Sequence, residues 1–267
     1  MTDTEKIIAE LITYQDSDAV KGMASFGINP DKTLGVRIPI LRSIAKRYKK
    51  QHKIALELWK TEIHEARILA SMVDDPKLLT EEQMENWVVD FDSWDICDQV
   101  IMNLFEKRKD LAYKKPYEWC RRDEEFVKRA GFVLIARLAH SDKNADDKKF
   151  EQFFQLIISK ADDNRNFVKK AVNWAIRQIG KRNLSMNKAT LELSKKIQKM
   201  DYKSAKWIAN DAIRELTDEK ILERFRMQDA GCKIQDARCR MQDARCRMQD
   251  AGCRMPRRAN FVSQDVG

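Results

Sequence analysis

Residues that break regular structure are scarce in this chain of 267 residues. It contains only 8 glycines and 5 prolines, while lysine, glutamate, alanine, isoleucine and leucine are abundant. Because glycine and proline supply many tight turns, their scarcity argues against a fold of many short strands. The composition predicts helices joined by short polar loops.

Several patterns that would indicate a cofactor, a metal or a membrane are missing as well. The sequence has no glycine-rich phosphate loop, no Gly-x-Ser-x-Gly motif and no metal-spaced set of ligands. Its longest apolar run, near Ala130 to Ala136, is too short to span a bilayer, and the N-terminal residues do not fit a signal peptide. We expect a protein without cofactor, metal site or membrane partner.

Cysteine is equally sparse before residue 227, where only Cys97 and Cys120 occur. The three histidines are scattered along the chain, at His52, His64 and His140. Two isolated thiols and dispersed imidazoles are typical of a reduced, cytoplasmic protein without structural zinc.

What the chain has in excess is positive charge. Its 51 lysines and arginines outnumber 42 aspartates and glutamates, giving a net charge of +9. Such an excess favours an anionic partner, and nucleic acid is the commonest one.

An internal repeat is visible in the second half of the sequence. The segment from Glu125 to Ala130 aligns with the segment from Asn166 to Ala171 at an offset of 41 residues. In this register Val133 corresponds to Trp174. A period of roughly 40 residues with two helices per unit is typical of HEAT-type or armadillo-type repeats. The sequence therefore predicts an all-α fold, a curved solenoid or α-α superhelix with a concave surface.

The repeat also brings basic residues into register. Lys128 and Arg129 correspond to Lys169 and Lys170, so equivalent cations should lie along one face and form a basic stripe that tracks phosphates. The alternative is that these side chains only keep a helical surface soluble.

One acid stands beside a tryptophan at helical spacing. Trp94 and Asp98 are four residues apart and share a helix face, with Asp98 about one turn after a helix start at Ser93. The helix dipole should keep a carboxylate there ionised, ready to stabilise a developing cation. The alternative interpretation is a core tryptophan beside an ordinary first-turn aspartate.

Trp174 allows the same two interpretations. It occupies the apolar repeat position of Val133, which favours core packing. Polar neighbours surround it in the segment from Asn173 to Gln178, and an exposed tryptophan in a basic groove can stack on a base or contact a cationic ring.

Four motifs in this order make the chain resemble the AlkD-like DNA alkylation repair family, which consists of alkylpurine DNA glycosylases built of HEAT-like repeats. The resemblance spans about residues 5 to 222 and rests on the segments from Gly35 to Arg42, from Ser93 to Asp98, from Phe126 to Ala130 and from Phe167 to Arg177.

The resemblance implies a monofunctional glycosylase that removes cationic N3- and N7-alkylated purines from duplex DNA, without turning the base into a deep pocket. It implies that Asp98 is the catalytic carboxylate and that Trp94 and Trp174 flank the sugar and backbone of the lesion. It also implies that Arg129 contacts DNA near the lesion. One position departs from the family pattern, because Phe26 replaces a tyrosine and so lacks its hydroxyl.

The sequence changes character near residue 227. From there Met-Gln-Asp-Ala-Arg-Cys-Arg recurs with a period of seven, which sets Cys232, Cys239, Cys246 and Cys253 at equal spacing. Residues 1–226 are therefore predicted to form the repeat domain, and residues 227–267 a basic, poorly ordered appendage or an additional nucleic-acid-binding arm.

Three functions remain open on the sequence alone. The first is a monomeric glycosylase acting on alkylated duplex DNA. The second is a helical-repeat scaffold that binds nucleic acid without catalysis. The third is a scaffold that binds another protein.

Overall fold

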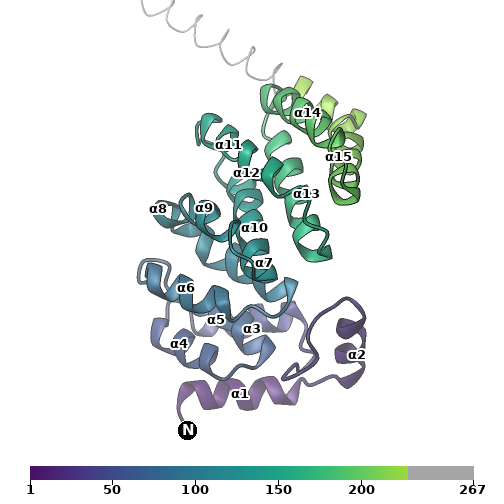
Figure 1. Cartoon of the computed structure of the whole chain (residues 1–267). Coiled ribbons are helices and arrows are strands. Elements are labelled where there is room, and N and C mark those ends of the chain that lie inside the picture. The colour runs from purple at the N-terminus through teal and green to yellow at the C-terminus, as the bar shows by residue number, and fades with distance from the viewer. Residues whose placement is uncertain (228–267) are drawn as a thin grey trace, which may run out of the picture. The chain divides into compact units, whose positions relative to one another are not determined.

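The computed structural model describes residues 1–227, and in these residues the regular structure is entirely helical. Met1–Asp218 form one compact unit, in which helices follow one another in chain order (Figure 1). The predicted all-α solenoid is confirmed. The helices of this unit are α1 (Asp3–Thr13), α2 (Ser17–Ser25), α3 (Ile38–Arg47), α4 (His52–Lys60), α5 (His64–Val73), α6 (Glu81–Val89), α7 (Trp94–Asn103), the 3-10 helix η1 (Phe105–Lys107), α8 (Lys109–Ala112), α9 (Lys115–Trp119), α10 (Glu125–Ser141), α11 (Lys148–Glu151), α12 (Phe154–Ser159), α13 (Asn166–Gly180), α14 (Leu184–Gln198) and α15 (Lys203–Leu216).

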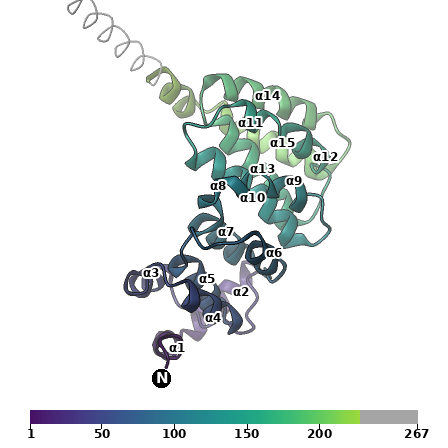
Figure 2. The ribbon, with the colours of Figure 1, turned by 90° about the vertical axis from the view of Figure 1, so that its left-hand side faces the viewer.

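The two helices that carry the clearest repeat pack directly on each other. α10 and α13 lie side by side in both ribbon views (Figures 1 and 2) and make an extensive contact. Equivalent residues meet there, since the rings of Phe126 and Phe167 have centroids 5.5 Å apart. Ala130 and its repeat partner Ala171 are both buried. The 41-residue offset therefore describes the spacing of stacked units.

A run of aromatic side chains fills the core between α4 and α9. Trp59 and Trp87 stack with centroids 4.0 Å apart, and Phe105 joins Trp87 to Trp119 at centroid distances of 6.4 and 6.0 Å. All four side chains are buried. Burial of this much aromatic surface stabilises the stack strongly. Three of the six tryptophans thus belong to the core, and the others are available for a surface.

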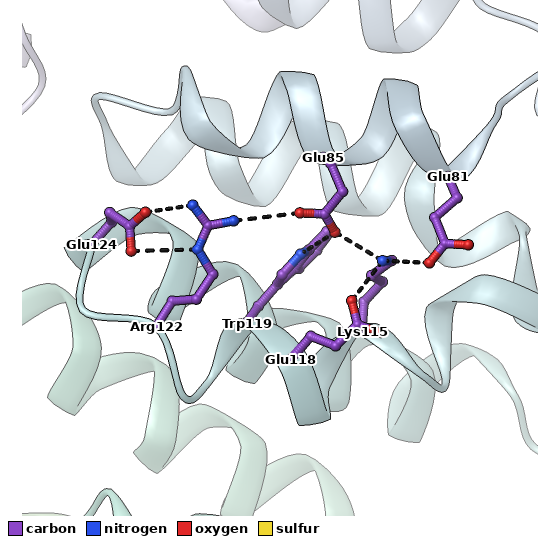
Figure 3. A network of polar contacts seen from close by, with 7 residues as sticks. All are labelled: Glu81, Glu85, Lys115, Glu118, Trp119, Arg122 and Glu124. Carbon is purple, nitrogen blue, oxygen red and sulfur yellow. Dashed lines mark hydrogen bonds and ion pairs between the residues drawn. The ribbon is translucent and has the colours of Figure 1, made fainter.

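A buried lysine ties α6 to α9 (Figure 3). Lys115 is 2% exposed and forms ion pairs with Glu81, Glu85 and Glu118 at 2.6 to 2.8 Å, while Trp119 donates to Glu85 at 2.8 Å. Burial alone would lower the pKa of Lys115, but hydrogen bonds to the three glutamates outweigh it and raise the pKa. Lys115 is therefore charged, and its ion pairs stabilise the contact between α6 and α9.

A second anchor fixes the loop that follows α2. Glu65, which is 1% exposed, accepts hydrogen bonds from the backbone N–H groups of Leu34, Gly35 and Val36 at 2.9, 2.7 and 3.1 Å. Gly35 has a φ of +82°, and a Cβ atom there would lie 2.3 Å from the carbonyl oxygen of Asp16. Only glycine fits this approach, which brings the loop close to the backbone just before α2.

Among the described residues, 219–227 belong to a second unit. The predicted boundary between residues 226 and 227 stays a prediction, and the heptad repeat beyond Met227 lies outside the described residues. Within residues 1–227, none of the helices combines the length and apolar character that crossing a bilayer requires.

Candidate functional site

Asp98 lies in the first half of α7, where its carboxylate is held by an arginine from α10. α7 begins after Ser93, so Asp98 follows about one turn later and shares a face with Trp94, as the spacing predicted. Nε and Nη2 of Arg129 donate to Oδ1 of Asp98 at 3.1 and 2.9 Å, and Nη2 also donates to Oδ2 at 2.9 Å. Arg129 therefore fixes the orientation of the carboxylate.

Burial controls the charge of this carboxylate. Desolvation raises the pKa of Asp98 from 3.8 to about 6, even though the neighbouring Arg129 guanidinium lowers it. The side chain of Asp98 is only 20% exposed, so desolvation outweighs the charges that favour the ionised form. A pKa of about 6 lies below neutral pH, so the ionised form of Asp98 predominates at pH 7.

Trp94 and Trp174 converge on Asp98. Both indole rings are half-buried, and together with Asp98 they line one cavity of about 490 Å³. Nε1 of Trp94 donates to the backbone carbonyl of Phe26 at 3.2 Å. Trp174 also packs against the hydrophobic core, so its core role and its place beside Asp98 coexist.

Two further hollows meet at the same carboxylate. A cavity of about 270 Å³ is lined by Phe26, Trp94, Asp98, Arg129, Phe167 and Lys170. A neighbouring one of about 430 Å³ is lined by Asp98, Arg129, Lys170, Asn173, Trp174, Arg177, Trp207 and Asp211. We call these two together the Asp98 groove. Phe26 is 73% exposed here, so its ring is accessible to a partner.

The predicted basic stripe is only partly present. Lys170 is exposed and lines the groove, and the Nζ atom of Lys169 lies 5.0 Å from the ring centroid of Trp207. Lys128 and Arg129, in contrast, are each 6% exposed. The expectation that Lys128 lies on the open surface is wrong, because it turns inward and pairs with a carboxylate of the next repeat unit, Asp163, at 3.4 Å.

Three contributions to the site were not predicted from the sequence. Trp207 is 40% exposed and extends the groove, Glu65 fixes the loop after α2, and Arg137 lines the 490 Å³ cavity while donating to Glu106 at 2.7 Å. Trp207 and Glu65 each carried a weak signal, since the segments from Lys206 to Arg214 and from Glu65 to Ala70 faintly resemble the repeated segment. Arg137 carried none.

The thiols near the site are inert. Cys97 and Cys120 are fully buried, and burial raises the pKa of each thiol well above its usual range. Among residues 1–227, no group of three or more His, Cys, Asp and Glu side chains could hold a metal ion.

Comparison with known proteins gives matches to one family model and to several solved structures. The model of the family described as DNA alkylation repair enzyme matches residues 7–216. No curated protein matches the chain.

Among solved structures, a similar one comes from a family of proteins related to the HEAT-like repeat DNA glycosylases, with affinity for branched DNA structures. It matches with a TM-score of 0.67 and 18% identity over 80% of this chain and 95% of its own, which shows a shared fold. An engineered protein and a designed armadillo repeat protein, each 13% identical, give TM-scores of 0.34 and 0.29. They cover 81% and 69% of this chain and 99% and 82% of their own.

Proposed function

The chain belongs to the family of DNA alkylation repair enzymes, and we propose that it hydrolyses the N-glycosidic bond of cationic N3- and N7-alkylated purines in duplex DNA. The observation that carries this proposal is the convergence of Trp94, Asp98 and Trp174 on one cavity, with an exposed cation, Lys170, in the adjoining groove. Such a surface suits an anionic polymer that carries a cationic lesion.

The proposed reaction uses the charge that the lesion already carries. As the bond between C1′ of the sugar and the purine breaks, its electron pair leaves with the base, which becomes neutral. Positive charge develops on the sugar, where the ionised carboxylate of Asp98 stabilises it. Water then adds at C1′ and loses a proton to solvent.

Arg129 acts in this scheme as a positioning residue. It is buried, it holds both oxygens of Asp98, and its Nη1 donates to the carbonyl oxygen of Phe167 at 2.8 Å. A carboxylate oriented in advance needs no reorganisation as charge develops on the sugar. We therefore assign the DNA contact that the resemblance implies for Arg129 to its exposed repeat equivalent, Lys170.

The two tryptophans and Phe26 complete the proposed contact with DNA. The half-buried rings of Trp94 and Trp174 would flank the sugar of the lesion, and the exposed ring of Phe26 would lie against the neighbouring nucleotide. The reaction needs no lysine Schiff base, so the product is abasic DNA with an intact strand. The proposed reaction requires neither a cofactor nor a second subunit. We propose that the protein acts as a monomer on DNA in the cytoplasm.

The test is the release of free bases from methylated duplex DNA. Wild-type protein should release 3-methyladenine and 7-methylguanine, and Asp98→Asn, which keeps the shape and removes the charge, should release little. A matched control is Asp92→Asn, an exposed aspartate just before α7, which should behave as wild type. If wild-type protein releases no base, the proposed activity is refuted.

A second candidate function is binding of DNA without catalysis. One observation favours it, because Arg129 already holds both oxygens of Asp98 in the free protein. The solved relative with affinity for branched DNA suggests such a role as well. This function predicts salt-sensitive DNA binding that survives Asp98→Asn, with no base released by either protein.

A further inference from the structure

A further hollow, outside the Asp98 groove, is lined by positive charge. It has a volume of about 270 Å³, and four exposed cations line it: Arg42, Lys46, Lys49 and Lys107. The first two belong to α3, Lys49 follows that helix and Lys107 lies in η1. The other lining residues are neutral, so no carboxylate of the described chain borders this hollow. We call it the basic hollow.

The four cations of the basic hollow are available to an anion. Within residues 1–227, none of their side chains forms a hydrogen bond or an ion pair. Two arginines of the Asp98 groove differ in this respect, since Arg129 is held by Asp98 and Arg177 by Glu215. Like charges that converge without a counter-ion repel one another, and a bound anion relieves that repulsion.

The basic hollow lies on the same face of three helices as the 490 Å³ cavity that Asp98 lines. Each helix contributes a residue to that cavity and, four positions later, one to the basic hollow: Ile38 and Arg42 in α3, Ile68 and Met72 in α5, and Gln99 and Asn103 in α7. Four residues make about one turn, so the basic hollow lies roughly 5–6 Å further along the same face. A polymer that contacts Asp98 can therefore reach the basic hollow as well.

The basic hollow and the Asp98 groove extend in opposite directions from α7. The helices pack in the order α3, α5, α7, α10 and α13 (Figure 1). The basic hollow is lined from α3 to α7, whereas the groove continues from α7 through α10 to α13 and α15. Packed helices lie about 8–10 Å apart, so α3 is about 16–20 Å from α7. Along a duplex that crosses these helices, this distance corresponds to about five base pairs at 3.4 Å each.

We propose that the basic hollow binds backbone phosphates of the duplex that flanks the lesion, on the side of Asp98 away from α13. The inference rests on the proposed function, because a lesion at Asp98 fixes the position of the duplex. Contacts to phosphates position DNA without reading its sequence, so the basic hollow adds affinity and register but no sequence preference. Four cations at one end of the site make the footprint asymmetric. One flank of the lesion therefore contributes more to binding than the other.

Binding of an undamaged duplex tests the charge of the basic hollow without catalysis. Lys46→Gln/Lys107→Gln removes two of its charges. The matched control, Lys53→Gln/Lys188→Gln, removes two exposed charges from α4 and α14, which line neither the basic hollow nor the Asp98 groove.

Each phosphate contact contributes about 1 to the slope of log K against log salt concentration. The basic-hollow variant should therefore lower that slope by about 2 and weaken binding at least about tenfold at about 0.1 M salt. The control carries the same net charge and should stay close to wild type. Equal slopes in the two double variants would overturn the proposal.

Moving the lesion along the DNA tests where the basic hollow binds. Duplexes of constant length carry one 7-methylguanine, with either the 5′ or the 3′ flank shortened to about three base pairs, too short to reach from α7 to α3. Below saturation, wild-type protein should release the base at least about tenfold more slowly when one of the two flanks is short. The basic-hollow variant should lose this difference between the flanks. Equal rates for the two duplexes with wild-type protein, or an undiminished difference in the variant, would contradict the proposal.

The outcomes separate this inference from the proposed function. All four substitutions replace exposed side chains, so folding should be kept, and thermal unfolding checks this. If wild-type protein releases no base, the glycosylase is refuted, whereas the salt slopes still report whether the basic hollow binds phosphates. Normal base release together with equal salt slopes would overturn the role of the basic hollow and leave the glycosylase proposal intact. An acidic protein surface would then be the partner that its charge fits.

Discussion

Replacing Arg129 with glutamine should shift the pH dependence of excision, because this arginine helps to keep Asp98 ionised. In the wild-type protein the pKa of Asp98 is about 6, the result of desolvation opposed by Arg129. Glutamine removes the positive charge, so the protonated acid becomes relatively more stable and the pKa rises. Loss of activity on the acidic side should then begin at a higher pH.

The size of the shift follows from the contacts. A hydrogen bond to a charged group is worth about 1.5–3 kcal/mol, and one pKa unit corresponds to about 1.4 kcal/mol. The fork of Arg129 on Asp98 should therefore be worth about 1–2 pH units. Arg129→Lys keeps the charge but loses the planar fork, so its shift should be smaller.

The appropriate measurement is kcat/KM for base release between pH 5 and pH 9, because this ratio reports ionisation in the free enzyme. Arg177→Gln is the matched control, since Arg177 also lines the Asp98 groove but pairs with Glu215. It should alter DNA affinity without moving the midpoint. An acidic midpoint in Arg129→Gln equal to that of wild type would refute the assignment of Arg129 as the residue that orients and charges Asp98.

Three further predictions concern stability and binding. Because the folded-state pKa of Asp98 lies above its usual 3.8, the stability that its protonated form contributes is present below pH 3.8 and is lost as the pH rises through about 6. Between pH 4 and pH 8, the free energy of urea unfolding of the wild-type protein should therefore fall by up to about 3 kcal/mol relative to that of Asp98→Asn. The opposite trend would contradict the raised pKa. Glu65→Gln removes a charged acceptor from three backbone N–H groups and should lower the free energy of unfolding by about 2–4 kcal/mol, whereas exposed Glu62→Gln should change it by less than about 0.5 kcal/mol. Phe26→Ala should leave the unfolding temperature nearly unchanged, since the ring is 73% exposed, but weaken DNA binding by about 1–3 kcal/mol in a titration, and unchanged affinity would remove Phe26 from the interface.

The sequence predicted the parts of the fold that depend on local periodicity. Glu125 and Asn166 begin α10 and α13, at the offset read from the repeat, and the rings that follow them meet in space. Trp94 and Asp98 share a helix face because four residues make about one turn. Such relations need only the geometry of a helix and of a repeated unit.

Contacts between side chains far apart in the sequence could not be predicted. The pairing of Arg129 with Asp98 joins residues 31 positions apart, and that of Lys128 with Asp163 joins residues 35 apart. Each depends on which way a side chain turns at a helix contact, and the repeat register leaves that choice open. The register alone therefore suggested two surface cations where the structure has two buried ion pairs.

The sequence contained even less indication of the 490 Å³ cavity lined by Trp94, Asp98 and Trp174. Its walls come from helices as far apart in the sequence as α2 and α13, and its volume depends on how closely those helices approach. Glu65, which fixes the loop after α2, is the one acid of α5, a helix that is buried along almost its whole length. Sequence patterns of charge and hydropathy do not distinguish it from a solvated glutamate.

The central claim is that the carboxylate of Asp98 drives removal of a cationic purine, and single-turnover excision from a duplex with one 7-methylguanine tests it most directly. Wild-type protein should convert the lesion to an abasic site with the strand intact, and Asp98→Asn should be slower by about 100-fold or more. Equal rates for the two proteins, or no abasic product from wild type, would contradict it.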